Sequence, residues 1–241
     1  MVDAWRALVA VPTYNEVENV EPLVKAVLAQ DGRLEVLVID DASPDGTGDI
    51  ADAMATAEAR VHVLHRAGKM GLGSAYVAAF GWALAQGYDL VFEMDCDFSH
   101  DPIDLPRFLA AIEHTDLVLG SRYIRGGSTP DWGWHRRLIS LGGNLFSRLL
   151  LRLRTHDCTG GYRCYRADLL RRVPLDQIRA QGYAFQVGMV YYVERLGGQV
   201  LEIPITFRDR RVGESKMSGD IVREAFAYVV RLALADTRAS R

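Results

Sequence analysis

Apolar and polar positions alternate in blocks along the first 120 residues. Short apolar runs predict strands at 7–11, 34–39, 61–65, 88–94 and 116–120. Between these runs, apolar side chains recur at helical spacing, which predicts helices at 17–30, 48–59, 73–86 and 105–113. Strands that alternate with helices are typical of βαβ units around a mostly parallel sheet. The pattern therefore predicts an α/β fold, with ligands bound at the carboxyl ends of the strands.

The pattern becomes less regular after residue 120. A stretch rich in Gly, Pro and Trp at 125–134 predicts a mobile loop, and the stretch 155–166 predicts a second loop. Two further helices are predicted at 138–153 and 221–235, and one further strand is predicted at 199–207. No low-complexity linker divides the chain, so we expect a single domain over residues 1–241.

Composition excludes several classes of protein. Of the 241 residues, 49% are hydrophobic and 24% are charged, which is enough apolar surface for a packed core and unlike a disordered chain. The cysteines Cys96, Cys158 and Cys164 form no CxxC pair, which argues against a disulfide scaffold and a structural zinc site. No apolar run reaches about 18 residues, and the N-terminus lacks a basic signal region, so we expect a cytosolic chain without a membrane span.

The charge of the chain is unevenly distributed. Residues 1–120 hold 7 Lys+Arg and 20 Asp+Glu, whereas residues 121–241 hold 21 and 11. The acidic half suits a cation and the basic half suits an anion or an anionic membrane. The alternative is two solvated charged faces. A nucleic-acid partner is disfavoured, because the chain is acidic overall and carries no known binding motif.

Two carboxylates, Asp95 and Asp97, follow the predicted strand at 88–94. If the chain turns there, both can face one point beyond the strand. Mg²⁺ and Mn²⁺ prefer such oxygen ligands and readily bridge them to phosphate. Aspartate is also common in turns, so a lone DxD is a weak signal. The buried strand in front of it favours a metal–phosphate site.

Polar clusters also follow the first two predicted strands. Asp40 and Asp41 either belong to turn chemistry and helix capping, for which Ser43, Asp45 and Thr47 are suited, or accept hydrogen bonds from a nucleotide base or ribose. Tyr14 and Glu16 offer an aromatic ring and an acceptor, which again suit a base and a ribose. All of these clusters should converge on one crevice, because they follow strands of the same sheet.

The glycine-rich stretch 68–75 matches neither common phosphate-binding fingerprint. It is not a Walker A loop, because Met70 follows the lysine, and Tyr76 stands where a dinucleotide fingerprint needs its third glycine. The stretch predicts a tight turn that opens a helix, with amide groups available to an anion.

Eight short motifs occur in a fixed order along roughly residues 7–220. They are PTYNE at 12–16, VIDDASPDGT at 38–47, GKMGLGSAY at 68–76, MDCDFSHDP at 94–102, GSRY at 120–123, CTGGYRCYR at 158–166, GYAFQ at 182–186 and RRVGESKM at 210–217. The series resembles the dolichol-phosphate mannose synthases, also called polyprenol monophosphomannose synthases, within the family 2 glycosyltransferases. The ordered set is highly specific, although each motif alone is not.

The resemblance implies a GT-A (Rossmann-like) fold that binds GDP-mannose. Residues 1–120 would form the nucleotide-sugar half and residues 121–220 the acceptor half, followed by an amphipathic helix and tail at 221–241. By similarity, the guanosine is held by Pro12, Tyr14, Glu16, Ile39 and Asp41. The ligands of a Mg²⁺ or Mn²⁺ cofactor are Asp95, Asp97 and Ser99, and Cys96 adds main-chain contacts to the donor. The residues at the sugar or the diphosphate, which are implied to be catalytic, are Asp97, Arg122, Arg210 and Lys216.

Two positions depart from the pattern that the resemblance implies. Ser99 stands where some relatives carry Gln as a further metal or phosphate contact. Gly188 stands where an acidic residue is usual. Any acid supplied from that position is missing here, or the site does not need it.

The segment 121–180 has the composition of an acceptor-phosphate site. It holds twelve arginines, no lysine and four acids. Guanidinium groups bind phosphate oxygens bidentately, so we predict that Arg136, Ser140 and Arg163 hold the phosphate of a polyprenyl phosphate. That phosphate is already an anionic nucleophile, so no strong base is required, and a single in-line displacement predicts inversion to a β-mannosyl phosphoryl polyprenol. The alternative is that these arginines are solvated surface residues.

The predicted helix at 138–153 carries an apolar stripe beside arginines, which suits a membrane interface as well as it suits a core. We therefore expect a peripheral protein on the cytoplasmic face of the membrane, with a separate membrane-anchoring protein as a further candidate partner. Two other functions stay open. One is a family 2 transferase that moves glucose or N-acetylglucosamine to a lipid or hydroxyl acceptor, and the other is an inactive subunit that binds nucleotide sugar or lipid phosphate.

Overall fold

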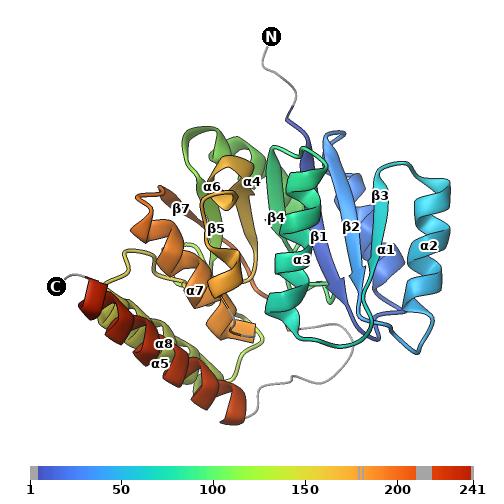
Figure 1. Cartoon of the computed structure of the whole chain (residues 1–241). Coiled ribbons are helices and arrows are strands. Elements are labelled where there is room, and N and C mark those ends of the chain that lie inside the picture. The colour runs from blue at the N-terminus through green and yellow to red at the C-terminus, as the bar shows by residue number, and fades with distance from the viewer. Residues whose placement is uncertain (1–4, 179, 181, 210–218, 240–241) are drawn as a thin grey trace.

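A central sheet organises the protein (Figure 1). The computed structural model describes residues 5–178, 180, 182–209 and 219–239. In this part of the chain the sheet has seven strands in the order β3-β2-β1-β4-β6-β5-β7. The strands are β1 (Ala7–Thr13), β2 (Leu34–Asp40), β3 (Val61–His65), β4 (Leu90–Glu93), β5 (Leu117–Ser121), β6 (Arg163–Arg166) and β7 (Val200–Pro204).

The sheet is parallel except for β6, which confirms the predicted fold class. β6 pairs antiparallel with both of its neighbours, β4 and β5. It occupies the end of the stretch 155–166 that was predicted as a loop, so that prediction is wrong for 163–166 and is confirmed for 155–162, which form neither helix nor strand. The strand is only four residues long and has an arginine at each end, so it shows no apolar run. Its side chains are nevertheless buried from Arg163 to Tyr165.

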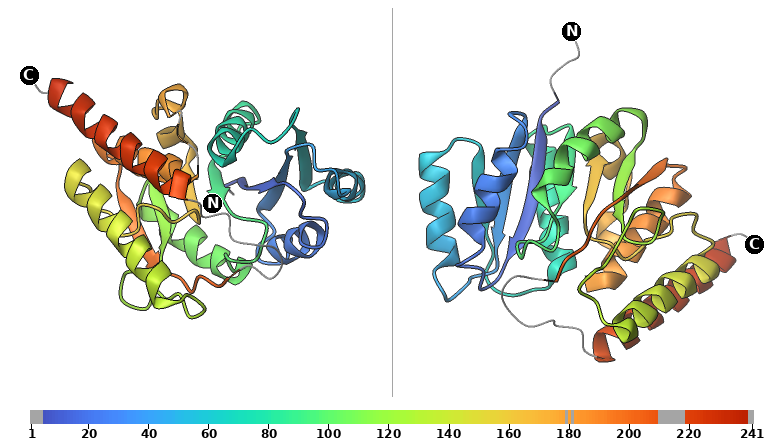
Figure 2. Two further views of the ribbon diagram at one scale, coloured as in Figure 1. Left: turned by 90° about the horizontal axis from the view of Figure 1, so that it is seen from below. Right: turned by 180° about the vertical axis from the view of Figure 1, so that it is seen from behind.

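Helices cover both faces of the sheet (Figures 1 and 2). They are α1 (Val20–Leu28), α2 (Thr47–Ala57), α3 (Leu72–Ala85), α4 (Leu105–Ala111), α5 (Trp134–Leu151), α6 (Ala167–Leu170), α7 (Gly182–Arg195) and α8 (Gly219–Ala239). Residues of α1, α2 and α4 share one buried cluster with the sheet, and residues of α3 and α7 share a second cluster on the other face. Burial of this apolar surface stabilises the layers by roughly 25 cal/mol per Å².

The helices α5 and α8 lie side by side next to α7, away from the sheet (Figure 2). The rings of Phe146 and Phe226 stack between them with centroids 4.4 Å apart. These helices confirm the predictions at 138–153 and 221–235, with shifted ends. α7 was not predicted, because nine of its fourteen residues are buried around the whole helix and leave no polar face.

The order of the strands creates a crevice at one edge of the sheet. From β1 the chain proceeds outward to β2 and β3, and then returns to β4 on the other side of β1. Ligands of open α/β sheets bind at such a switch point, beyond the carboxyl ends of the strands. None of the helices in the described ranges is long and apolar enough to cross a membrane.

Candidate functional site

A cavity of about 380 Å³ opens at the carboxyl ends of β1, β2 and β4. We call it the strand-end cavity. Most of the donor-site residues that were predicted line it. They are Pro12, Tyr14, Glu16, Asp41, Asp95, Cys96, Asp97, Ser99 and Arg122. The structure therefore brings together side chains from the ends of four strands, as parallel strand ends require.

The turn after β4 determines how the two carboxylates are presented. Phe98 adopts a left-handed conformation, with φ of 60°, and the amide of Ser99 donates a hydrogen bond of 3.0 Å to Asp97 Oδ1. The chain bends here, so Asp95 and Asp97 both reach the cavity. Ser99 also borders the cavity, and its Oγ is buried without a hydrogen-bond partner. These oxygens provide hard ligands, which is the chemistry that Mg²⁺ and Mn²⁺ prefer.

His100 stabilises this turn. Its Nδ1 accepts a hydrogen bond of 3.2 Å from the Asp95 amide, and its ring stacks on Tyr162 at 4.9 Å. Burial lowers the pKa of His100 to about 4, so the ring is neutral at neutral pH and Nδ1 is free to accept. Sequence reasoning missed this residue, although it lies within MDCDFSHDP, because a histidine beside a DxD has no fixed spacing rule.

The two aspartates after β2 have separate roles. Asp40 accepts hydrogen bonds from the hydroxyls of Thr13 and Ser43 at 3.2 and 2.6 Å, so it belongs to the turn. Asp41 faces the strand-end cavity, with its Oδ1 3.3 Å from Arg66 Nε. Burial raises the pKa of Asp41 despite that arginine. Of the two predicted readings, turn chemistry therefore fits Asp40 and a ligand acceptor fits Asp41.

Arg122 lies buried at the far end of the strand-end cavity. Its guanidinium donates to both oxygens of Asp157, from Nε at 2.7 Å and from Nη2 at 2.6 Å, and Nη2 also reaches Thr159 Oγ1 at 2.8 Å. Burial alone would raise the pKa of Asp157, but Arg122 holds it below its usual value. Asp157 was not predicted, since a single aspartate in a glycine-rich stretch carries no sequence signal of its partner.

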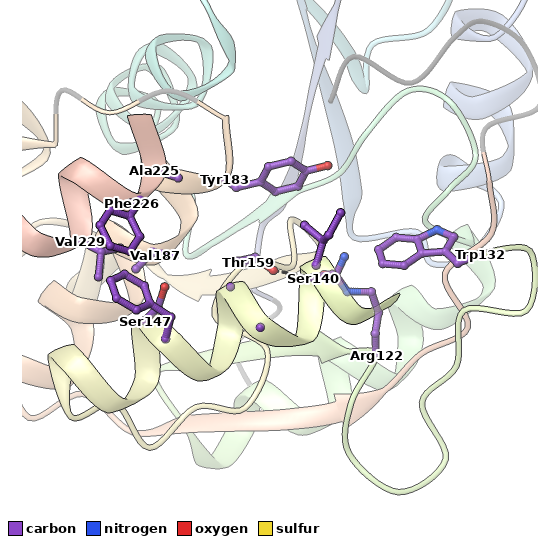
Figure 3. A pocket seen from close by; sticks show the side chains of 14 residues that line it. Arg122, Trp132, Ser140, Ser147, Thr159, Tyr183, Val187, Ala225, Phe226 and Val229 are labelled. Carbon is purple, nitrogen blue, oxygen red and sulfur yellow. Dashed lines mark hydrogen bonds between the residues drawn. The ribbon is translucent and has the colours of Figure 1, made fainter. Parts of the chain in front are cut away.

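A second cavity of about 340 Å³ lies between α5, α7 and α8 (Figure 3). We call it the helix cavity. Phe226 and Val229 gather at one end of it, whereas Arg122 and Trp132 stand at the other (Figure 3). Arg122, Thr159 and Tyr183 line both cavities, so the two spaces meet at these side chains.

Arg136 and Ser140 lie near this junction, one helical turn apart on α5. Arg136 lines the strand-end cavity, pairs with Asp209 at 2.5 Å and lies 4.2 Å from the ring centroid of Trp132. Ser140 lines the helix cavity, and its Oγ accepts a 2.5 Å hydrogen bond from the hydroxyl of Tyr123. Positions i and i+4 share one face of a helix, so a single phosphate could contact both.

Arg163 is a correction to the predicted acceptor site. Its side chain is fully buried, and its guanidinium donates to the carbonyls of Cys158, Gly160 and Gln186 and to the Tyr165 hydroxyl. It lines neither cavity. These partners occupy the donors that a phosphate would need, so Arg163 supports the fold beneath the site.

Three other predicted residues are not placed in a cavity. Ile39 is fully buried in β2 and packs in the core, so its side chain does not close the nucleotide pocket as predicted. Arg210 and Lys216 lie outside the described residues.

The glycine at position 188 has a packing explanation. A Cβ added there would lie 2.6 Å from the hydroxyl of Tyr228 on α8. The position therefore faces α8, and the absence of a side chain allows the two helices to approach. Gly188 lines neither cavity, so the acid expected there is not missing from a cavity wall.

Comparisons with known proteins match this arrangement. The family model described as glycosyl transferase family 2 matches residues 8–173. An undecaprenyl-phosphate mannosyltransferase of Micrococcus luteus is 50% identical over 230 residues, 95% of each chain. A polyprenol monophosphomannose synthase of Mycolicibacterium smegmatis is 46% identical, over 93% of this chain and 85% of its own. Glucosyl-3-phosphoglycerate synthase of Mycobacterium tuberculosis, solved with Mn²⁺, uridine diphosphate and phosphoglyceric acid, has a TM-score of 0.70 at 20% identity, over 95% of this chain and 78% of its own.

Proposed function

Because the chain belongs to glycosyl transferase family 2, we propose that it transfers mannose from GDP-mannose to a polyprenyl phosphate, giving β-mannosyl phosphoryl polyprenol and GDP. The observation that carries the proposal is the meeting of two unlike cavities at Arg122. One is lined by carboxylates and suits a sugar nucleotide with its cation. The other is apolar with an arginine at one end, and suits a phosphate attached to a hydrocarbon chain. The names of the two curated relatives support the same acceptor and sugar.

The donor would occupy the strand-end cavity in a defined direction. The guanosine lies by Tyr14, Glu16 and Asp41, where a ring and two carboxylates can stack and accept hydrogen bonds. The diphosphate lies by Asp95 and Asp97. The mannose then points to the junction of the cavities, where it can be attacked.

The residues after β4 fit a divalent cation. Two carboxylates and the unpartnered Oγ of Ser99 border the same cavity. Among the described residues no three His, Cys, Asp or Glu side chains form a complete metal cage, so further ligands would come from the diphosphate and water. When bound, Mg²⁺ or Mn²⁺ supplies positive charge that stabilises the leaving diphosphate.

The chain's own residues would position the acceptor. Arg136 and Ser140 lie near the junction of the cavities, where they can hold the phosphate against the sugar, and Arg122 remains a proposed contact of the sugar or the diphosphate. A polyprenyl phosphate is ionised near neutral pH, so the site needs orientation more than a strong base. Attack from the helix cavity meets the sugar on the side opposite the diphosphate, which inverts the anomeric carbon. Arg210 and Lys216 remain proposed contacts of the diphosphate.

The outer surface of α5 supports a membrane location. Its exposed large apolar side chains are Trp134, Leu138, Leu141, Leu145, Leu149 and Leu150, whereas the exposed Ile139 lines the helix cavity. Exposed Arg137 and Arg152 flank them and would meet anionic headgroups. We place this surface on the cytoplasmic face of the membrane, where it would bring the helix cavity to the lipid acceptor. A separate membrane-anchoring protein would bind the same apolar surface.

The proposal is tested by incubating the purified protein with radiolabelled GDP-mannose and polyprenyl phosphate, followed by organic extraction. We expect labelled lipid only when Mg²⁺ or Mn²⁺ is present, and NMR of the product should show the β anomer. GDP-glucose, UDP-glucose and UDP-N-acetylglucosamine are the control donors. Faster transfer from one of these, or full activity in excess chelator, would contradict the proposed donor or the proposed metal.

A further inference from the structure

The side-chain amide of Gln186 on α7 has a hydrogen-bond partner for its nitrogen but none for its oxygen. Its Nε2 donates a 2.6 Å hydrogen bond to Glu93 Oε2, and its Oε1 has no partner. The side chain is only 2% exposed, and it forms part of the wall of the strand-end cavity. A buried acceptor without a donor is unfavourable, so this position calls for a donating group from the cavity.

Glu93 determines which end of the amide is left unpartnered. The carboxylate is fully buried and accepts a second hydrogen bond, of 3.1 Å, from the Tyr165 hydroxyl. Burial raises the pKa of Glu93 to about 7, although Arg163 and the two hydrogen bonds favour the charged form. In that ionised form the carboxylate only accepts, so it requires the NH₂ of Gln186 and turns the carbonyl away. Arg163 completes the network by donating to the Tyr165 hydroxyl and the Gln186 carbonyl of the main chain. The amide therefore cannot flip without losing its bond to the ionised form of Glu93.

The position of Gln186 in the cavity points to the sugar rather than the nucleotide. An added Cβ on Gly161 would lie 3.7 Å from Gln186 Nε2 and 3.6 Å from His100 Cε1, and His100 in turn holds the Asp95 amide. Tyr183, one turn earlier on α7, borders the junction with the helix cavity. Gln186 thus lies close to the turn that carries the carboxylates and to the junction with the helix cavity.

We propose that Gln186, oriented by Glu93, accepts a hydrogen bond from one hydroxyl of the donor sugar and so contributes to sugar specificity. The inference rests on the proposed function. A site built to bind a hydroxyl discriminates strongly against a sugar that lacks it, because the buried acceptor is then left unpaired. Gln186 is in this sense a specificity residue, and Glu93 is a positioning residue that acts through it.

The test compares the binding of GDP-mannose and GDP by calorimetry, with Mn²⁺ present. Gln186→Met keeps the length of the side chain but removes the acceptor, so it should weaken GDP-mannose binding about 10-fold and leave GDP binding unchanged. Gln177→Met, at an exposed glutamine away from both cavities, is the matched control and should change neither. Equal losses for GDP and GDP-mannose, or no loss for either, would overturn the proposal.

Deoxy analogues of the donor identify the hydroxyl. In the wild type, one of the monodeoxy GDP-mannoses should bind about 10-fold more weakly than GDP-mannose, and Gln186→Met should lose no further affinity for it. Fully additive losses at every hydroxyl would contradict the proposal.

Three more variants keep the test valid if Gln186→Met does not fold. Gly161→Ala meets only ordinary van der Waals contacts, one of them with Gln186 Nε2, and should reduce GDP-mannose binding by narrowing the cavity beside the amide, again without affecting GDP. Glu93→Gln retains an acceptor for Nε2 and should preserve the discrimination, whereas Glu93→Leu should lose it. Failure of the wild type to transfer mannose would instead reject the proposed function, so the two ideas fail separately.

Discussion

The two cavities that meet at Arg122 have opposite linings, and each lining follows from the elements that build it. The strand-end cavity is formed by turns after parallel strands, where polar residues such as Asp41 and Asp97 are accommodated without disturbing the core. The helix cavity is formed by facing sides of α5, α7 and α8, which present Phe146, Val187 and Phe226. The difference teaches that one chain can build a carboxylate-lined cavity and an apolar cavity side by side from two kinds of packing, which is what the proposed charged donor and lipid acceptor would require.

A second contrast separates the helices on the sheet from α5. On α3 the large side chains Tyr76 and Phe80 are fully buried, whereas on α5 Leu138 is 59% and Leu149 is 72% exposed. Isolated exposed apolar residues need no explanation, but a series along one helix marks an interaction surface. α5 therefore has an inner side that closes the helix cavity and an outer side available to a membrane.

The largest effect should come from the strand-end cavity. Asp97→Ala removes a carboxylate that we place next to the diphosphate, so transfer should fall on the order of 1000-fold, and GDP-mannose should bind more weakly in Mn²⁺. Extraction of labelled lipid and calorimetry provide the two measurements. Asp168→Ala, at an exposed carboxylate outside both cavities, is the control. If Asp97→Ala transferred mannose as fast as the wild type, the strand-end cavity would not be the donor site, and the contrast between the two cavities would lose its functional meaning.

The sequence predicted the strand-end cavity better than the helix cavity. Polar residues after periodic strands converge because parallel strands end at one edge, so Tyr14, Asp41 and Asp97 could be placed in advance. Side-chain direction is not encoded in this way. Ile39 and Arg163 both occur in motifs of the resembled family, yet each points into the interior. The helix cavity depends on contacts between segments far apart in sequence, which no local pattern gives.

An intermediate effect is expected at the junction. Arg136→Ala should raise the apparent KM for polyprenyl phosphate about 10- to 100-fold, because a charge-assisted bond to phosphate is lost. GDP-mannose binding should change little. Arg171→Ala, directly after α6, is the control, since that arginine pairs with Asp168 outside both cavities. If GDP-mannose binding falls and the acceptor KM does not, Arg136 belongs to the donor side.

A smaller effect is expected where we place the lipid tail of the acceptor, as distinct from its phosphate. Phe226→Ala removes a ring that lines the helix cavity and stacks on Phe146, so the KM for a long polyprenyl phosphate should rise about 10-fold. A phosphate carrying a single isoprene unit cannot reach that end of the cavity, so its KM should stay the same. Kinetics with the two acceptors in detergent measure this difference. An equal rise for both acceptors would show that Phe226 maintains the helix pair instead of contacting the chain.

The smallest effect should concern the outer side of α5, where single side chains contribute separately to membrane binding. Leu149→Gln should reduce sedimentation with anionic vesicles about threefold, which is less than full burial of a leucine would give, because a helix lying at the interface immerses each side chain only in part. Ile103 is 68% exposed but lies outside α5, so Ile103→Gln is a closely matched control that should bind like the wild type. Transfer to an acceptor in detergent should be normal in both variants, because neither residue lines a cavity. Added salt should weaken vesicle binding of the wild type and of Leu149→Gln alike, since it screens the arginines and not the apolar contact. If Leu149→Gln and Ile103→Gln sediment equally, the exposed apolar series on α5 does not bind the bilayer, and a separate protein becomes the better candidate for that surface.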